Sequence, residues 1–318
     1  MEWLWPVSWQ VDLLVFGIAL CIDLVVGDPP NALHPVAWFG WVVSQIERRL
    51  PKEPKWPALA CGLLLTLGAA ALFAAAAGWA AYGALQVGTW AYVVVAALLL
   101  KSSFSVRLLT RSALSVSESL QRGELAEARL RIGRLVSRKT ERLAPPQIAS
   151  AAIETVAENT TDSFIAPWLA FAVLGLPGAF AYRAINTLDS MIGFRGRFEN
   201  LGKAAARLDD VVNLIPARVS ALLLLVAGAI QGLQVRAGFA LMRREHALTA
   251  SPNAGWTMSA MAGLLGVELV KPGYYRLGAG QRVPEATDVL AAVRCCYLVA
   301  AFGALVALEI LFLRHVVV

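Results

Sequence analysis

Long apolar stretches constrain this chain more than any other feature of its sequence. The strongest lie at residues 58–77, 82–100 and 291–313. A helix that crosses the hydrocarbon core of a bilayer needs about 20 predominantly apolar residues. Only 16% of the 318 residues are charged, whereas soluble domains usually carry about 25%. The sequence therefore predicts an all-α fold, a polytopic helical membrane protein.

Three further apolar runs are weaker. Residues 13–27 contain Asp23, residues 164–181 contain two prolines, and residues 219–230 are short. If the second and third runs both cross, the segment between them lies outside, although it is rich in arginine and lysine. Basic loops usually stay in the cytoplasm. We therefore favour broken or re-entrant helices at these two runs, with two complete crossings as the alternative.

Residues 101–163 form the largest polar segment. Its apolar residues recur at helical spacing, and Pro145-Pro146 suits the first turn of a helix. We expect cytoplasmic helical segments here. The sequence contains no evident repeat, linker or second soluble domain, so we expect one membrane-embedded domain over residues 1–318.

The net charge of +6 does not indicate a nucleic-acid partner. The basic residues lie between apolar runs, where they fix membrane orientation. Residues 1–10 contain no lysine or arginine, so we expect no cleaved secretory signal. These features predict a multi-pass protein of the bacterial inner, cytoplasmic membrane.

Two groups of polar residues occur before residue 163. Asp23 lies within an apolar run, where an ionisable group indicates a functional site or, alternatively, a helix end that reaches water. His34 follows a proline turn and suits a structural or hydrogen-bonding role. Glu154 and Glu158 are four residues apart and share one helical face. With Asn159 they suit Mg²⁺ or, equally, a solvated helix edge.

A third polar group is the most informative. It comprises Arg183, Asn186, Asp189, Arg207, Asp209, Asp210, Asn213 and Arg218. The spacing predicts that Asp209 and Asn213 share a helical face. Acidic and amide groups for a metal, interleaved with arginines for phosphate, indicate a phosphoryl site. A network of buried ion pairs is the alternative.

Residues 251–256, Ser-Pro-Asn-Ala-Gly-Trp, predict a turn that leads into a helix. Ser251 or Asn253 can cap this helix, and its free N–H groups suit an anion; a plain helix start is the alternative. The chain lacks the GxxxxGK[ST], HExxH and GxSxG motifs.

Taken in order, these motifs resemble those of the CobD/CbiB family of cobalamin biosynthesis. The resemblance covers residues 20–295 and rests on five stretches, namely 23–36, 153–162, 182–194, 206–218 and 251–256. One departure occurs at Arg138-Lys139-Thr140, where the family typically has Arg-Asp-Thr. We therefore leave Lys139 out of the expected site.

The resemblance implies an adenosylcobinamide-phosphate synthase. Such an enzyme uses ATP, with Mg²⁺ as a substrate complex, to join adenosylcobyric acid to (R)-1-amino-2-propanol phosphate. It implies metal binding by Asp209, Asp210 and Asn213, and catalytic roles for Glu154, Glu158 and Asp189. The expected substrate- or phosphate-binding residues are Arg183, Asn186, Arg207, Arg218, Ser251, Asn253 and His34. Other late cobalamin-pathway enzymes are expected partners.

Three other functions compete with this one. The first is a non-catalytic, AmpE-like membrane regulatory protein. The second is a membrane phosphotransferase with an Asp-rich Mg²⁺ site, although its DGxxAR run is not found. The third is a transporter, which an intramembrane Asp23 and broken helices would suit.

Overall fold

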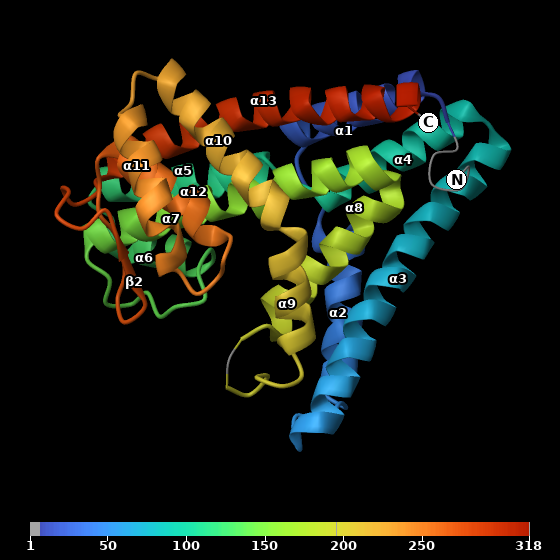
Figure 1. Ribbon diagram of the computed structural model, residues 1–318, viewed down its shortest axis with the longest axis horizontal. Helices are drawn as coiled ribbons and strands as arrows, with labels where there is room; N and C mark the ends of the chain where they lie inside the picture. The colour runs from blue at the N-terminus through green and yellow to red at the C-terminus, as the bar shows by residue number, and fades with distance from the viewer. Residues whose placement is uncertain (1–6, 195, 318) are drawn as a thin grey trace. The chain divides into compact units, whose positions relative to one another are not determined.

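The computed structural model describes residues 7–194 and 196–317. Helices dominate it (Figure 1), and the β structure of the described residues is one antiparallel hairpin and one isolated parallel bridge between Val267 and Arg282. The chain divides into two compact units, each assembled from separate stretches of sequence. Unit 1 comprises residues 1–105, 166–212 and 305–318, and unit 2 comprises residues 106–165 and 213–304. The prediction of a single domain over residues 1–318 stays a prediction.

Unit 1 is built from six helices and the end of a seventh. The six are α1 (Trp9–Val25), α2 (Pro35–Glu47), α3 (Lys55–Val87), α4 (Thr89–Ser103), α8 (Ala166–Ile192) and α9 (Lys203–Val212), with a short turn η1 (Asn31–Leu33) before α2. Helix α8 packs against α3, α4, α2 and α9. Val43 of α2, Leu188 of α8 and Ala205 of α9 belong to one buried cluster that joins these helices.

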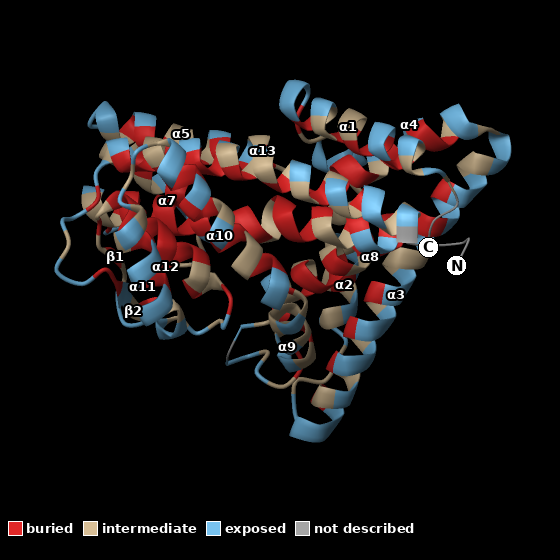
Figure 2. Cartoon of the chain, turned by 45° about the horizontal axis from the view of Figure 1, so that its top comes forward, coloured by how far each residue is buried: buried red, intermediate tan, exposed pale blue. Residues whose placement is uncertain are grey.

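Unit 2 contains the remaining elements. They are α5 (Arg107–Gln121), α6 (Leu125–Gly133), α7 (Pro145–Thr160), a π-helical turn η2 (Thr161–Ile165), α10 (Leu214–Ile230), α11 (Val235–Glu245), η3 (His246–Leu248), α12 (Ala254–Leu265), β1 (Leu269–Lys271), β2 (Tyr275–Leu277) and the first part of α13 (Ala286–Val317). Helices α7 and α12 pack together and are buried along most of their length, as Figure 2 shows. The hairpin of β1 and β2 pairs Leu269 with Leu277 and lies against α7.

Four helical segments of the described chain are long and apolar enough to cross a membrane. They are Lys55–Val87, Thr89–Gln121, Pro145–Ile192 and Ala286–Val316, and α9 with α10 forms a bent pair that gives a fifth if it counts as one span. The predicted polytopic helical membrane fold is therefore confirmed. Helix α1 is not among these spans, because its 17 residues fall short of the about 20 that a bilayer requires.

The boundaries of two predicted spans differ from those observed. We expected separate spans at residues 58–77 and 82–100, but α3 continues through Val87 without a break. Its alanine-rich sequence favours a helix and offers no interruption before Gly88. Gly88 has a φ of 151°, which residues with a Cβ rarely adopt. The helix therefore ends there.

The expected break in the run at residues 164–181 is present. Helix α8 leaves helical geometry at Gly175, where φ is 66° and ψ is −160°, a region almost restricted to glycine. Pro177 follows and lacks the N–H that would continue the hydrogen-bond ladder. Two carbonyl groups of the turn before this break receive Arg314, whose guanidinium donates to the carbonyl oxygens of Phe171 at 3.3 Å and Ala172 at 2.9 Å. This arrangement satisfies backbone groups that lipid could not.

The predicted helices of the polar segment 101–163 are also present, as α5, α6 and α7. Pro145 occupies the first turn of α7, as expected. Which side of the membrane this segment faces stays a prediction.

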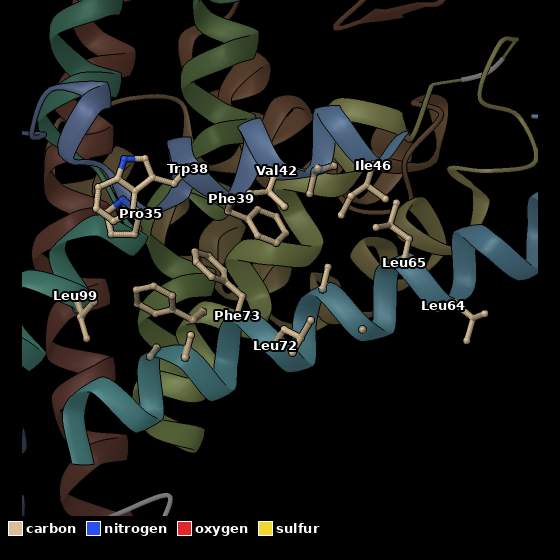
Figure 3. A pocket seen from close by; sticks show the side chains of 16 residues that line it. Pro35, Trp38, Phe39, Val42, Ile46, Leu64, Leu65, Leu72, Phe73 and Leu99 are labelled. Atoms are coloured by element: carbon tan, nitrogen blue, oxygen red, sulfur yellow. The ribbon is translucent and has the colours of Figure 1, made fainter. Parts of the chain in front are cut away.

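An apolar groove separates α2 from α3 in unit 1 (Figure 3). It has a volume of about 580 Å³ and is lined from Pro35 to Ile46 on α2 and from Leu64 to Ala77 on α3. Phe39 and Phe73 stack at 4.6 Å between ring centres, and Phe180 of α8 also lines the groove.

Candidate functional site

A polar cluster joins α8 to α9 in unit 1. Arg183 and Asn186 lie one turn apart on α8, and an Nη of Arg183 donates to Oδ1 of Asn186 at 3.5 Å. The Nδ2 of Asn186 donates to Oδ1 of Asp209 on α9 at 3.3 Å. We call these three residues the Asp209 cluster. The structure thus brings together a guanidinium, an amide and a carboxylate that the sequence had assigned to one site.

The neighbouring predicted residues are less enclosed. Asp189 lies one turn beyond Asn186 and is half-buried. On α9, the guanidinium of Arg207 lies 4.0 Å from a carboxylate oxygen of Asp210. The side chain of Arg207 is 76% exposed, so this ion pair contributes little to stability. The guanidinium of Arg207 therefore faces solvent.

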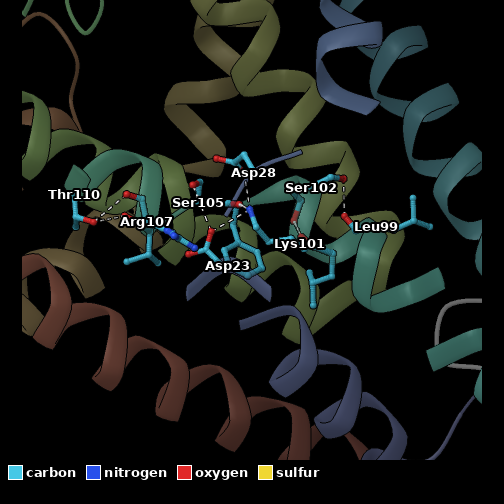
Figure 4. A network of polar contacts seen from close by, with 12 residues as sticks. Asp23, Asp28, Leu99, Lys101, Ser102, Ser105, Arg107 and Thr110 are labelled. Atoms are coloured by element: carbon cyan, nitrogen blue, oxygen red, sulfur yellow. Dashed lines mark hydrogen bonds and ion pairs between the residues drawn. The ribbon is translucent and has the colours of Figure 1, made fainter. Parts of the chain in front are cut away.

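A second network surrounds Lys101 of α4 (Figure 4). Its ammonium lies 3.0 Å from Oδ1 of Asp23 and 2.5 Å from Oδ1 of Asp28, and it donates to the carbonyl of Phe104 at 3.2 Å. The hydroxyl of Ser105 donates to Asp23 at 3.4 Å. We call Asp23, Asp28, Lys101 and Ser105 the Lys101 network. Asp23 and Lys101 are almost fully buried, and burial is tolerated because the charges are paired.

Sequence analysis missed Lys101. It ends an apolar run, so it resembled one more basic residue at a membrane edge. A useful signal was available: an intramembrane carboxylate such as Asp23 requires a partner, and Lys101 also borders an apolar run.

His34 begins α2 beside this network. Its Nδ1 accepts a hydrogen bond from the N–H of Val36 at 3.2 Å, which is an N-cap interaction. Burial lowers the pKa of His34; Asp28 acts in the opposite direction, and Arg183 and Lys101 lower it further. The imidazole is therefore neutral at pH 7, as its role as an acceptor requires. These effects also place His34 within electrostatic reach of both the Lys101 network and Arg183.

In unit 2, Glu154 of α7 lies at the centre of a buried network. Its Oε1 accepts from Ser150 at 2.6 Å, and its Oε2 accepts from Tyr275 at 2.8 Å and from Arg138 at 3.2 Å. The N–H of Val270 donates to Ser150 at 2.8 Å. We call Arg138, Ser150, Glu154 and Tyr275 the Glu154 network. It fastens the β hairpin to α7.

Glu158 occupies the same face of α7 one turn later, as predicted. It is exposed, whereas Glu154 is buried. Burial raises the pKa of the Tyr275 hydroxyl, and the charges of Glu154 and Glu158 raise it further. Tyr275 therefore stays protonated and donates. Since both oxygens of Glu154 are occupied, Glu158 is the more accessible of the two carboxylates.

The predicted turn at residues 251–256 meets Arg218 of α10. The guanidinium of Arg218 donates to Oδ1 of Asn253 at 3.1 Å and lies over the Trp256 ring at 4.7 Å. The hydroxyl of Ser251 accepts from the N–H of Asn253 at 3.2 Å. We call these four residues the Arg218 cluster. Asn253 precedes α12 but does not cap it with its side chain, which instead receives Arg218.

Asn213 corrects one prediction. Helix α9 ends at Val212, and Asn213 is the N-cap residue before α10, so Asp209 and Asn213 do not share a face of one helix. Pro216 explains the break, because it cannot donate to the carbonyl of Val212 and its ring would clash with that carbonyl. The metal role of Asn213 stays a prediction.

Lys139 lies in the loop before α7 and is exposed. Its neighbour Arg138 belongs to the Glu154 network, and its neighbour Thr140 is buried and donates to the carbonyl of Arg129 at 3.0 Å. The departure from the family pattern therefore falls on an exposed side chain. The residue before it is half-buried and the residue after it is buried.

The predicted site residues thus divide between the units. His34, Arg183, Asn186, Asp189, Arg207, Asp209 and Asp210 lie in unit 1, and Glu154, Glu158, Asn213, Arg218, Ser251 and Asn253 lie in unit 2. Across residues 7–194 and 196–317, no group of three or more His, Cys, Asp or Glu side chains could hold a metal ion. The predicted Mg²⁺ and its ligands stay a prediction.

Comparisons with known proteins agree with the motifs. A family model described as CobD/Cbib protein matches residues 16–296. "Cobalamin biosynthesis protein CobD" of Dehalococcoides mccartyi is 44% identical over 266 residues, which are 84% of this chain and 86% of the relative.

Two more distant relatives give the same result. "Probable cobalamin biosynthesis protein CobD" of Methanothermobacter thermautotrophicus is 40% identical over 84% of this chain and 87% of its own. "Cobalamin biosynthesis protein CobD" of Klebsiella pneumoniae is 36% identical over 86% of each chain. No solved structure matches the chain.

Proposed function

Because the chain belongs to the CobD/CbiB family of cobalamin biosynthesis proteins, we propose that it is an adenosylcobinamide-phosphate synthase. It joins the f propionate carboxylate of adenosylcobyric acid to the amine of (R)-1-amino-2-propanol phosphate and consumes ATP. The product is adenosylcobinamide phosphate.

The chemistry requires activation of the carboxylate. Its oxygen attacks the γ-phosphorus of ATP, which forms an acyl phosphate and releases ADP. The amine then attacks the acyl carbon, the C–N bond forms, and inorganic phosphate leaves with the electrons of the broken C–O bond. A base takes the proton that the ammonium must lose before it can attack. The enzyme therefore needs cations for phosphate, carboxylates for Mg²⁺ and one accessible base.

The observation that carries this proposal is the Asp209 cluster. Two hydrogen bonds link three groups from two helices: the guanidinium of Arg183 donates to the amide of Asn186, which donates to the carboxylate of Asp209. All three come from the motifs that resemble the family, and His34 lies within electrostatic reach of Arg183. A merely structural ion-pair network would not require an amide between the two charges, whereas a polyphosphate with its metal uses all three kinds of group.

We assign the Mg²⁺–ATP substrate to this cluster. Its donor set fits, since Mg²⁺ commonly takes one or two carboxylates together with substrate phosphates. Asp209 and Asp210, with Asp189 one turn from Asn186, would supply the carboxylates. Arg183 and Arg207 would bind phosphate oxygens. Bound Mg²⁺ would neutralise charge that develops on the transferred phosphoryl group.

For unit 2, we propose that Glu158 is the base. Glu154 instead holds the β hairpin, because three donors already occupy its two oxygens. Arg218, with Asn253 and Ser251, would bind the phosphate of the amine substrate, since a guanidinium fixed by an amide and an aromatic ring presents its remaining N–H groups in a defined direction.

The competing functions receive less support. The relatives reported above are named for cobalamin biosynthesis, which does not favour an AmpE-like regulator. An Asp-rich phosphotransferase would carry a DGxxAR run, which the sequence does not contain.

The chain is a membrane protein by its candidate spans, and we propose the bacterial inner membrane as its location. Other late enzymes of cobalamin synthesis are the proposed partners there. Isolation of the tagged chain from inner-membrane vesicles, with its co-purifying proteins identified, tests both statements.

A direct assay tests the reaction. The purified protein is supplied with adenosylcobyric acid, ATP, Mg²⁺ and aminopropanol phosphate, and the corrin mass is followed. We expect an ATP-dependent shift to the mass of the amide, with Asp209→Asn lowering the rate at least about a hundredfold. Glu199→Gln is the matched control, because it removes an exposed carboxylate from the loop before α9. Absence of amide from wild-type protein, or full activity of Asp209→Asn, would contradict the proposal.

A further inference from the structure

The groove between α2 and α3 lies outside every polar cluster described above. All sixteen residues that line it are apolar. Several are widely exposed, with Trp38 at 53%, Leu64 at 72% and Leu72 at 73%. The groove is therefore open along its length, and its volume of about 580 Å³ lies within the range of small-molecule sites.

The membrane setting restricts what can fill this groove. Helix α3 is a candidate membrane span, and only 22% of its apolar window is buried within the structure. In a bilayer, the exposed face of this span would meet lipid. The indole N–H of Trp38 is the side-chain donor in the lining, and it already donates to the carbonyl of Ala32 at 2.9 Å. The groove therefore suits a hydrocarbon chain, which needs no polar partner.

Positive charge marks one end of the groove. Ile46 is the last groove residue on α2, and the exposed Arg48 and Arg49 follow within three residues. Lys55 begins α3 on the other side of the connecting loop and is also exposed. Lys52 is partly neutralised, because its ammonium lies 3.5 Å from a carboxylate oxygen of Glu47. Glu53 in the same loop is exposed and offsets one positive charge, and Arg197 also lies 4.0 Å from Glu47. Positive charge therefore remains in excess at this end, and the two adjacent arginines carry most of it.

Charge at one end and a purely apolar surface along the rest match the chemistry of one class of ligand. An anionic phospholipid has a negative headgroup joined to hydrocarbon chains. A guanidinium binds phosphate oxygens through paired N–H groups, and basic residues next to a membrane span attract anionic lipids. We propose that the α2–α3 groove binds one acyl chain of an anionic phospholipid, whose phosphate lies against Arg48 and Arg49.

Gly68 provides a sharp test, because it lines the groove and a Cβ added there would meet no atom within 4 Å. Gly68→Leu therefore begins its side chain in open space at the groove and occupies part of it, and leucine favours a helix more than glycine does. Gly83→Leu is the matched control. It lies on the same helix, a Cβ there also meets nothing within 4 Å, and it does not line the groove.

The assay is native mass spectrometry of the full chain in detergent, with phosphatidylglycerol or phosphatidylcholine of identical acyl chains added. We expect bound phosphatidylglycerol on wild type and Gly83→Leu, and at least tenfold less on Gly68→Leu. The double variant Arg48→Gln with Arg49→Gln is expected to lose phosphatidylglycerol to the same extent. Its control is Arg122→Gln with Arg134→Gln, which removes two exposed arginines of unit 2. Gel filtration and thermal unfolding verify that each variant is folded.

Three results would overturn the proposal. Unchanged binding to folded Gly68→Leu would show that the lipid lies elsewhere. Equal binding of phosphatidylcholine and phosphatidylglycerol would remove the role of the arginines. Conversion of a dimer to a monomer by Gly68→Leu would identify a second copy of the chain as the occupant. None of these results depends on synthase activity.

Discussion

Replacing Lys101 by methionine tests whether its buried ammonium stabilises the packing of α4 against α1 and against the turn that follows α1. The ammonium lies 3.0 Å from Asp23 and 2.5 Å from Asp28 and is 2% exposed. Removing one partner of a buried ion pair costs about 3–5 kcal/mol, because the remaining charge stays buried. One kcal/mol moves the unfolding midpoint of a large domain by about 2–4 °C. We therefore expect Lys101→Met to lower the midpoint by roughly 6–20 °C.

A second substitution identifies the cause. Asp23 is fully buried, whereas the Asp28 side chain is 17% exposed and can reach water. Asp23→Asn combined with Lys101→Met should therefore recover at least about half of the loss, since a neutral amide replaces the buried carboxylate that lost its ammonium. Lys203→Met, which removes an exposed lysine of α9, is the control.

Thermal unfolding in detergent, followed by circular dichroism, measures five proteins: wild type, Lys101→Met, Asp23→Asn, the double variant and Lys203→Met. The reasoning would be refuted if Lys101→Met melted within about 2 °C of wild type, which is less than 1 kcal/mol by the same conversion. It would also be refuted if the two substitutions were simply additive.

Three further predictions concern stability. Arg314→Met should lower the unfolding midpoint more than Arg314→Lys does. Lysine keeps a positive charge beside Asp12, whereas methionine removes that charge and also the guanidinium that donates to two carbonyls of α8. Equal losses in the two variants would contradict this. Gly175→Ala should lower the free energy of unfolding by about 1–3 kcal/mol, because the φ of 66° and ψ of −160° at Gly175 disfavour a residue with a Cβ. Gly83→Ala should instead be neutral or stabilising. Chemical unfolding of the two variants distinguishes these outcomes. The pKa of His34 is lower in the folded chain than the ordinary value of about 6.5 that the unfolded chain keeps. Between these two pKa values the unfolded chain binds more protons than the folded chain, so stability falls as pH drops below about 6.5. His34→Asn keeps a capping side chain without titrating, and its midpoint should therefore change less than that of wild type between about pH 7.5 and 5.5.

Part of the candidate site could be predicted from spacing. Arg183 and Asn186 are three residues apart, which places them on one face of any helix, and they do contact each other. Glu154 and Glu158 likewise share a face of α7. Helical periodicity suffices for such pairs, because it is a property of the local backbone.

Spacing failed where two helices meet end to end. Asp209 and Asn213 have the separation of a shared face, but α9 ends at Val212, which lies between them. Pro216 causes this end, because it cannot donate to the carbonyl of Val212. The signal was present in the sequence, since a proline excludes the carbonyl four residues earlier from the ladder.

The apolar runs, the basic segments between them and the order of the motifs were sufficient to predict a helical membrane protein of this family. These properties depend on composition and on local periodicity, so they can be established without knowing which helices are neighbours. The partners of buried charges could not be established that way. Lys101 with Asp23, Arg138 with Glu154, and Arg314 with the carbonyls of α8 are each joined across long separations in sequence. Only packing decides such pairs, because a buried charge is stabilised by whichever opposite charge or dipole the tertiary structure brings within a few ångströms of it.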